Sequence, residues 1–249
     1  MKVYLNEITG IADAITTLFI SKRHWTRERE IEIRKVVERV TSRSGCLMPE
    51  IHPALGNISK DLATYNDWMD KLVTFGAAHI TMLRFIDFSI TVEGLHRAGQ
   101  DDWDAHAQRY NNRIIRTSTR AANNVFKAGE KSDFYQDKIL SSDEAFVYLG
   151  LNVPESFEKD GVTYVKTVNG YIREDMKDRQ DVKRGLYMLS IPSNFIFKVN
   201  LTEWAHVYKE RNINGGANPE VKELAETIAD LMFKMQPAFT RDLFLKIKN

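Results

Sequence analysis

A cluster of carboxylates and imidazoles in the middle of the chain is the first feature that could do chemistry. Asp101, Asp102 and Asp104 lie within four positions, and His96 and His106 flank them. Carboxylates can act as acids or bases, and they accept hydrogen bonds from a cytosine amino group but repel a uracil carbonyl. The same run is also typical of a solvated loop or a helix N-terminus, where the helix dipole favours negative charge. Both interpretations stay open.

The common enzyme signatures are absent from the sequence. It has no glycine-rich phosphate loop, dinucleotide-binding fingerprint or Gly-x-Ser-x-Gly elbow. The six histidines are scattered without an i, i+4 pair of ligands, so no metal site is predicted. Cys46 is the only cysteine, which excludes an intramolecular disulfide, and we interpret it as structural.

Composition narrows the class of protein. The 249 residues are 43% hydrophobic, which is enough for a sizeable core. A net charge of +1 gives no large field for holding duplex nucleic acid. No apolar run approaches the roughly 20 residues that a membrane span needs. We therefore expect a soluble, cytoplasmic protein that binds neither nucleic acid nor membrane, with any anion site local.

Periodicity predicts the elements of the N-terminal half. Apolar residues at helical spacing predict two amphipathic helices, over 5–20 and 26–42. Ser59 is predicted to cap a third helix, which Gly76 ends. Alternating apolar and polar residues then predict a half-buried strand over 83–93.

The C-terminal half mixes strands and helices. A short helix is predicted over 141–150, opened by Ser141 or Ser142, followed by a hairpin over 162–173 that turns at Asn169-Gly170. The apolar stretch 186–199 is strand-like despite its proline.

Two helices are predicted after that strand. Asn200 or Thr202 caps the first, which runs to about Arg211. Asn218 with Pro219 starts the second, and Pro237 breaks it. The apolar face of the second helix is predicted to comprise Val221, Leu224, Ala225, Ile228, Met232 and Phe233. No repeat or linker marks a boundary, so a single α+β domain is the simplest interpretation.

Three segments carry a resemblance to a known family. Residues 182–200 resemble, without a gap, the Ala-Arg-x-Val-Leu-Pro pattern and following aromatic strand of flavin-dependent thymidylate synthases. Glu210-Arg211, a glycine loop and Ala217-Asn218 are similar to that family's Leu-Arg-x-x-x-x-Ala-Gln segment. Ala107-Gln108-Arg109-Tyr110 resembles the end of its motif Arg-His-Arg-x-x-Ser-x-Asn-x-x-Ser-x-Arg-Tyr. The resemblance spans roughly residues 60–110 and 180–247.

The resemblance implies a fold and an activity. The expected fold is a single domain over 1–249, with a mixed or antiparallel sheet flanked by helices, divergent N-terminal helices at 1–45 and an inserted hairpin at 160–175. The expected reaction is C5 methylation of a pyrimidine deoxynucleotide, dUMP to dTMP, using methylenetetrahydrofolate, FAD and NADPH. The family's active sites lie between subunits, which implies a homotetramer.

Three arginines carry the nucleotide site that the resemblance implies. Arg109 and Arg184 would hold the nucleotide, and Arg211 would be the catalytic residue that polarises the pyrimidine ring. A guanidinium fork matches phosphate oxygens bidentately, and it can stabilise negative charge developing on the ring. The remaining substrate-binding positions are Asp102, Asp104, Ala107, Gln108 and Tyr110.

The flavin side of the motif departs from the family pattern. The family's Arg-His-Arg reads Arg97-Ala98-Gly99 here. Its two serines and its asparagine are replaced by Asp102, Ala107 and Asp104. Among the family's flavin contacts, only those at Arg97, Asn200 and His206 are carried over.

Three functions remain open. The first is the synthase itself. The second is a dUMP or dCMP C5 hydroxymethylase or methylase with altered flavin use, of the kind that a virus with modified bases encodes, and the replacements at Asp102 and Asp104 motivate it. The third is a catalytically inactive scaffold that binds a nucleotide.

Overall fold

The structure is a computed structural model of the 249-residue chain. It describes residues 1–42, 56–105, 113–116, 131–138, 140, 142–167, 170–178, 189–213 and 218–247. The chain divides into two compact units. Unit 1 comprises residues 1–2, 92–102 and 115–195, and unit 2 comprises residues 3–91, 103–114 and 196–249. Whether they form one domain, as the sequence predicts, stays a prediction.

The N-terminus corrects the first predicted helix. Residues Lys2–Thr9 form strand β1, and helix α1 begins only at Ile11 and ends at Ser21. Gly10 separates the two with a left-handed φ of 79°, and a Cβ there would lie 1.7 Å from the carbonyl oxygen of Phe85. Ile8 lies within the predicted helix but belongs to the strand. The chain changes from strand to helix at Gly10, where a residue with a Cβ would not fit.

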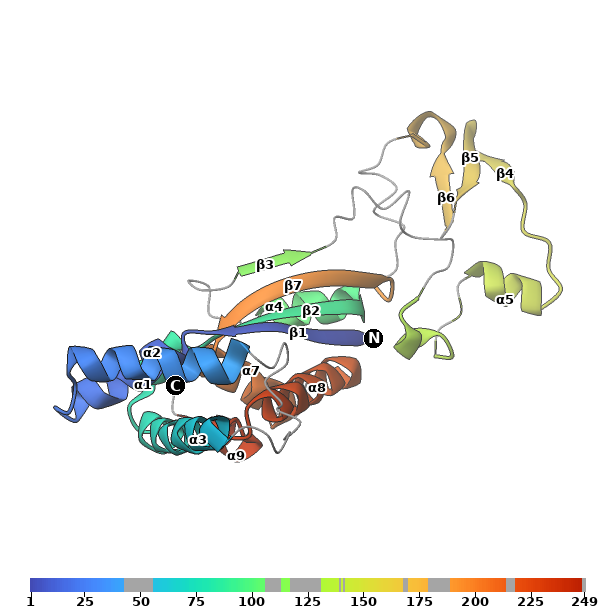
Figure 1. The fold of residues 1–249 in the computed structure, drawn as a ribbon. Coiled ribbons are helices and arrows are strands. Elements are labelled where there is room, and N and C mark those ends of the chain that lie inside the picture. The colour runs from blue at the N-terminus through green and yellow to red at the C-terminus, as the bar shows by residue number, and fades with distance from the viewer. Residues whose placement is uncertain are drawn as a thin grey trace. The chain divides into compact units, whose positions relative to one another are not determined.

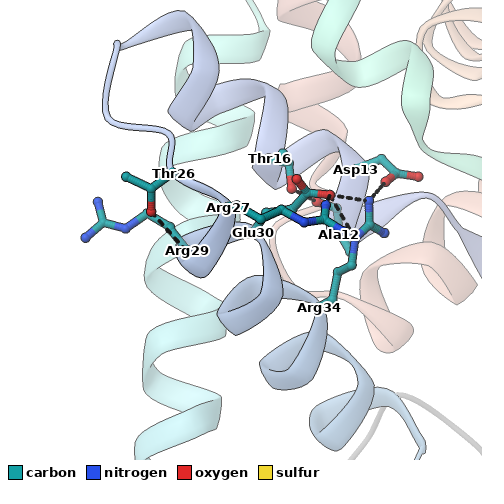
Figure 2. Close-up of polar contacts among 8 residues, drawn as sticks. All are labelled: Ala12, Asp13, Thr16, Thr26, Arg27, Arg29, Glu30 and Arg34. Atoms are coloured by element: carbon teal, nitrogen blue, oxygen red, sulfur yellow. Dashed lines mark hydrogen bonds and ion pairs between the residues drawn. The ribbon is translucent and has the colours of Figure 1, made fainter.

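Helix α2 spans Arg27–Ser42, as predicted, and an ion-pair cluster joins it to α1. Thr26 accepts a hydrogen bond from the Arg29 amide at 3.2 Å and so caps α2. Arg34 reaches both Asp13 of α1, at 2.8 Å, and Glu30 of its own helix, at 3.0 Å (Figure 2). These pairs are partly exposed, so they orient the helices more than they stabilise them.

Helix α3, Gly56–Gly76, ends at the predicted glycine but begins earlier than predicted, so Ser59 lies inside the helix and is not its cap. The following strand also begins later. Residues Ile80–Phe85 form a 3₁₀ turn, η1, and strand β2 spans Asp87–His96. The turn buries Leu83 against Gly76, where a Cβ would meet the leucine side chain at 2.6 Å. The first residues of the predicted strand therefore form the 3₁₀ turn, because tertiary packing decides their conformation.

The central sheet has the strand order β1-β2-β7-β3, with β7 over Pro192–Asn200 and β3 over Arg113–Arg116. The predicted strand at 186–199 is confirmed from Pro192 onward, where the proline stands at the first position of the strand. In unit 2, helices α1, α2 and α3 gather with α7, α8 and α9 on one side of the strands (Figure 1). The predicted α+β class, a sheet flanked by helices, is confirmed.

The last helices of unit 2 begin where the sequence predicts. Asn200 caps α7, Leu201–Asn212, and Asn218 caps α8, Pro219–Met235. Phe233 is wrongly assigned to the apolar face of α8, because its side chain is 46% exposed. It follows Met232 by about 100° around the helix and so lies beyond the buried stripe. Pro237 follows the end of α8 as predicted, and a further short helix, α9, spans Arg241–Lys246.

Unit 1 carries a second, smaller sheet after helix α5. Helix α5 spans Ser142–Tyr148, in agreement with the predicted helix at 141–150. Strands β4, β5 and β6 pair antiparallel in that order (Figure 1). They span Ser156–Lys159, Val162–Thr167 and Gly170–Arg173. The predicted hairpin is therefore confirmed, but Gly170 pairs with Thr167 as part of β6 and does not sit in the turn, and Asn169 lies outside the described residues.

No helix among the described residues is both long and apolar enough to cross a membrane.

Candidate functional site

The structure places only part of the predicted site. Asn200, His206 and Arg211 all lie on or next to helix α7 in unit 2. Arg97 and Asp102 lie on helix α4, Arg97–Ala105, in unit 1. The positions outside the described residues are Ala107, Gln108, Arg109, Tyr110 and Arg184, and of Asp104 the structure describes only the helical backbone.

Asn200 is fixed by its role as the cap of α7. Its Oδ1 accepts hydrogen bonds from the Thr202 amide at 3.0 Å, the Thr202 hydroxyl at 2.7 Å and the Glu203 amide at 3.0 Å. Its Nδ2 donates to the Glu203 carboxylate at 3.1 Å, so cap and third helical residue bind each other reciprocally. All three residues are buried. The predicted flavin contact of Asn200 therefore has at most one amide hydrogen left.

Arg211 lies in the last turn of α7 with only 4% of its surface exposed. A cation is favoured there by the negative end of the helix dipole. Burying a guanidinium is nevertheless costly, and buried charges concentrate where a protein uses them. Unlike most arginines, Arg211 is thus shielded from solvent.

Tyr208 stands one turn before Arg211 and is also buried. Its hydroxyl contacts the Glu226 carboxylate of α8 at 3.1 Å. Burial, together with this hydrogen bond to Glu226, raises the pKa of Tyr208 above its ordinary value. The phenol therefore remains protonated at neutral pH and fixes the C-terminal half of α7 against α8.

Asn212 is a candidate that the sequence reasoning missed. Both its Nδ2 and its Oδ1 are buried and lack a hydrogen-bond partner within the described part of the chain. A buried side-chain amide with neither end satisfied is rare and calls for a bound group. Its position next to Arg211 was visible in the sequence, but nothing in the sequence shows that its amide is buried.

The start of α4 is tied to the segment before β7. The amides of Arg97 and Ala98 donate to the carbonyls of Ile191 and Leu189, at 2.9 and 3.0 Å. A helix N-terminus binds anions through such free amides, and here two of them are already used. The Arg97 side chain, 21% exposed, donates to Gln100 at 3.3 Å and pairs with Asp101 at 3.5 Å.

Gly99 stands at the second arginine of the family's Arg-His-Arg. A Cβ at Gly99 would lie 2.4 Å from the His96 imidazole. The ring of His96 is buried and packs edge-on against Tyr135 at 4.9 Å. His96 thus fills the space that a side chain at position 99 would need.

Unit 1 also contains buried polar side chains in helix α4 and in the segment around the start of β7. Gln100 Nε2, Ser190 Oγ and Ser193 Oγ are buried without a hydrogen-bond partner in the described residues, so they could hold a polar ligand. Asp102 is half-buried on α4, and its predicted contact with the base stays a prediction. Trp103, which belongs to unit 2, packs edge-on against Phe197 at 5.5 Å, in the core. The described residues contain no group of three potential metal ligands.

Comparison with solved structures assigns the fold. The flavin-dependent thymidylate synthase from Helicobacter pylori, complexed with FAD and dUMP, matches with a TM-score of 0.50 and 12% identity over 100% of both chains. The fold is similar to that of a flavin-dependent thymidylate synthase. Another structure of the Helicobacter pylori enzyme with FAD and dUMP gives a TM-score of 0.48 and 12% identity, again over 100% of both chains. No family model matches the sequence, and no curated protein matches it.

The similarity bears out the fold that the resemblance implied. At 12% identity it shows a thymidylate synthase-like fold and leaves the roles of individual residues as predictions. The described residues nevertheless separate two groups of those predictions. Arg211 is buried, whereas the positions that the resemblance aligns with Arg-His-Arg are Arg97, Ala98 and Gly99, and His96 leaves no room for a side chain at Gly99.

Proposed function

We propose that this protein transfers a one-carbon unit to carbon 5 of a pyrimidine deoxynucleotide, converting dUMP to dTMP with methylenetetrahydrofolate, FAD and NADPH. The observation that carries the proposal is the burial of Arg211 at the end of α7, at the position that the resemblance assigns to the pyrimidine ring. The Helicobacter pylori enzyme of similar fold binds FAD and dUMP, which supports the same class of substrate. By the same resemblance we propose a homotetramer.

Arg211 would act on the ring electrostatically. Negative charge that develops on a ring oxygen makes the pyrimidine electron-rich and its carbon 5 nucleophilic, and a guanidinium placed beforehand stabilises that charge. The effect is stronger in a buried site because the local dielectric constant is low. Carbon 5 can then react without a protein nucleophile, so the chain needs no thiol for this step.

Asn212 would read the edge of the base. Its amide supplies one acceptor and two donors, which complement the carbonyl and N–H of a uracil ring. A bound pyrimidine would satisfy the buried Nδ2 and Oδ1. Arg109 and Arg184 would hold the phosphate, whose charge and geometry suit guanidinium forks.

The flavin fits this chain less well than the nucleotide does. Ala98 offers no polar side-chain atom, His96 fills the space at Gly99, and the oxygen of Asn200 is taken up by the helix cap. The described residues therefore do not reproduce the family's flavin contacts, and only Arg97 and His206 remain of those carried over.

This misfit favours a second candidate, a dUMP or dCMP C5 hydroxymethylase or methylase with altered flavin use. Adding water to a transferred methylene needs no reductant, so a hydroxymethylase can work without a reduced flavin. Asp102, half-buried on α4, could accept a hydrogen bond from a cytosine amino group.

Tritium release from carbon 5 tests both candidates. The purified protein is incubated with methylenetetrahydrofolate and either labelled dUMP or labelled dCMP, with and without NADPH and added FAD. Release from dUMP that requires NADPH supports the synthase, and release without NADPH supports the hydroxymethylase. A flavin that copurifies is seen as an absorbance band near ~450 nm, a property of the cofactor itself. No release from either nucleotide would leave the inactive nucleotide-binding scaffold as the function.

A further inference from the structure

Large apolar side chains in and beside the end of helix α5, in unit 1, are exposed. Their exposed fractions run from 42% to 85%. We call them the α5 apolar surface: Leu140, Phe146, Val147, Tyr148, Leu149 and Leu151. Single exposed apolar residues are ordinary, but a contiguous patch of several hundred Å² marks an interaction site.

This surface is a built structure and not a frayed helix end. Leu151 donates its amide to the Phe146 carbonyl at 2.8 Å, and Gly150 donates to Val147 at 3.0 Å. Gly150 adopts a left-handed φ of 69°, which completes a Schellman motif. A Cβ at Gly150 would meet nothing within 4 Å, so the glycine serves the turn and not close packing. The backbone thus holds Leu149 and Leu151 in defined places.

Two ion pairs fix the other end of α5 within unit 1. Glu144 pairs at 2.7 Å with Lys131, whose side chain is only 1% exposed. Asp143 pairs at 3.0 Å with Lys166 of β5. The carboxylates of α5 are therefore engaged inside the unit. The α5 apolar surface is presented on an anchored helix, which lowers the entropy that a partner must overcome.

The chemistry of the surface selects its partner. No residue from 145 to 154 is charged, and the nearest charges before it are the two engaged carboxylates. A nucleic acid or an anionic membrane would need exposed cations here. Residues 142–155 contain none, and Lys138, two positions before Leu140, is paired with Asp137 at 3.0 Å. An uncharged apolar surface complements itself, as a twofold interface between identical chains requires.

The area agrees with such an interface. At about 150–250 Å² for a whole large side chain, the six exposed fractions amount to roughly 600–900 Å². A standard interface buries about 800 Å² on each partner. We infer that the α5 apolar surface packs against the same surface of a second copy of this chain. This inference rests on the proposed homotetramer but not on the proposed reaction, because no residue of the α5 apolar surface belongs to the candidate site.

Sedimentation velocity of the full chain tests the inference. In the double variant Val147→Glu with Tyr148→Glu, both changes fall on side chains that are 74% and 85% exposed, so the fold of the chain is not disturbed. A tyrosine that becomes buried at an interface is a typical hot spot. Two negative charges on each partner would therefore raise the dissociation constant for self-association about 100-fold or more. The double variant is expected to sediment at half the mass of the wild-type assembly.

The matched control is Ile20→Glu, at a 55% exposed position of α1 in unit 2, which is expected to keep the wild-type mass. Circular dichroism verifies that all variants are folded. As a second readout, Tyr148→Cys in a Cys46→Ser chain should be joined into chain dimers by a short bismaleimide reagent, whereas Ile20→Cys should not.

Three outcomes overturn the inference. One is an unchanged mass in the double variant, and another is no cross-linking at position 148. The third is a monomeric wild-type protein. If that monomer cosediments with phosphatidylcholine vesicles and the double variant does not, the surface contacts membranes and not a second copy.

Discussion

Helix α7 and the start of helix α4 both lie in segments that resemble the same family, but they differ in how closely their side chains follow the family pattern. Around α7 the buried arginine and the asparagine cap are both in place. At the start of α4, the two positions that the resemblance aligns with polar side chains of the family are Ala98 and Gly99, and His96 fills the space beside Gly99. The comparison separates residues with a backbone task, such as a helix cap, from residues whose side chains would serve a ligand.

Asn200 illustrates the first kind of residue. It closes the N-terminus of α7 with three accepted hydrogen bonds, so replacing it destabilises the fold whatever the protein binds. Gln236 is similar, because it donates to the buried Tyr65 hydroxyl at 2.9 Å and accepts from the Ala238 amide at 3.1 Å. Arg211, in contrast, is a buried cation in the last turn of α7, and its burial is the stronger indication of function.

The largest expected effect is on activity, at Arg211. Arg211→Lys keeps the charge but loses the guanidinium fork, so turnover of the nucleotide should fall about 100- to 1,000-fold. The measurement is steady-state tritium release, with the unfolding midpoint as a check on folding. Arg241→Lys is the control, since Arg241 lies on α9 in the same unit, is 43% exposed and pairs with Glu226 and Asp230. Equal activity of the two variants would refute a role for Arg211.

The next effect tests the changed side of the comparison. Gly99→Ala should lower the free energy of unfolding by about 1–3 kcal/mol, because the new methyl group overlaps the His96 imidazole. Urea unfolding measures it. In a His96→Ala background the same substitution should cost much less, since the ring is gone. If the cost is the same in both backgrounds, His96 does not fill the space at position 99.

The two helix caps of unit 2 give a smaller effect. Asn200→Ala should cost about 2 kcal/mol, the upper end for a cap, and Asn218→Ala about 1 kcal/mol. The reason is that Asn200 is buried and accepts three hydrogen bonds, whereas Asn218, which accepts from the Glu220 amide at 3.0 Å, is only half-buried. Unfolding in urea compares the two variants directly. A larger loss for Asn218→Ala would contradict the assigned cap geometry.

The smallest effect at neutral pH concerns Tyr65. Tyr65→Phe removes the acceptor of Gln236 and should cost about 1 kcal/mol. Burial raises the pKa of Tyr65 to about 12, although the hydrogen bond from Gln236 opposes the shift. The unfolded chain releases this proton near ~10, so the wild-type stability should fall as the pH rises from about 10 to about 12. Unfolding free energies across that range should fall less steeply in Tyr65→Phe, and an identical slope would contradict the assignment.

Sequence reasoning succeeded where a local signal decides the structure. Asn200, Asn218 and Pro219 mark helix starts through chemistry that acts within a few residues, and the structure confirms each of them. It failed where the decision is made at a distance. The first predicted helix is partly strand β1, because Gly10 approaches the carbonyl of Phe85, far along the chain. Strand β4 has four exposed residues and so carries no alternating pattern at all.

The candidate site divides in the same way. The position of Arg211 followed from the resemblance, but its burial depends on how α7 packs and is not visible in the sequence. Asn212 gave no signal for the same reason. The filled space at Gly99 needed the packing of His96 on Tyr135, which joins residues far apart in the chain.

Titration calorimetry of dUMP into the purified protein tests the central claim, that the chain keeps a pyrimidine nucleotide site built on Arg211. We expect saturable binding with one nucleotide for each chain. Arg211→Lys should weaken that binding at least tenfold, and Arg241→Lys should leave it unchanged. If the folded wild-type protein binds neither dUMP nor dCMP, or if Arg211→Lys binds as tightly as the wild type, the claim is contradicted.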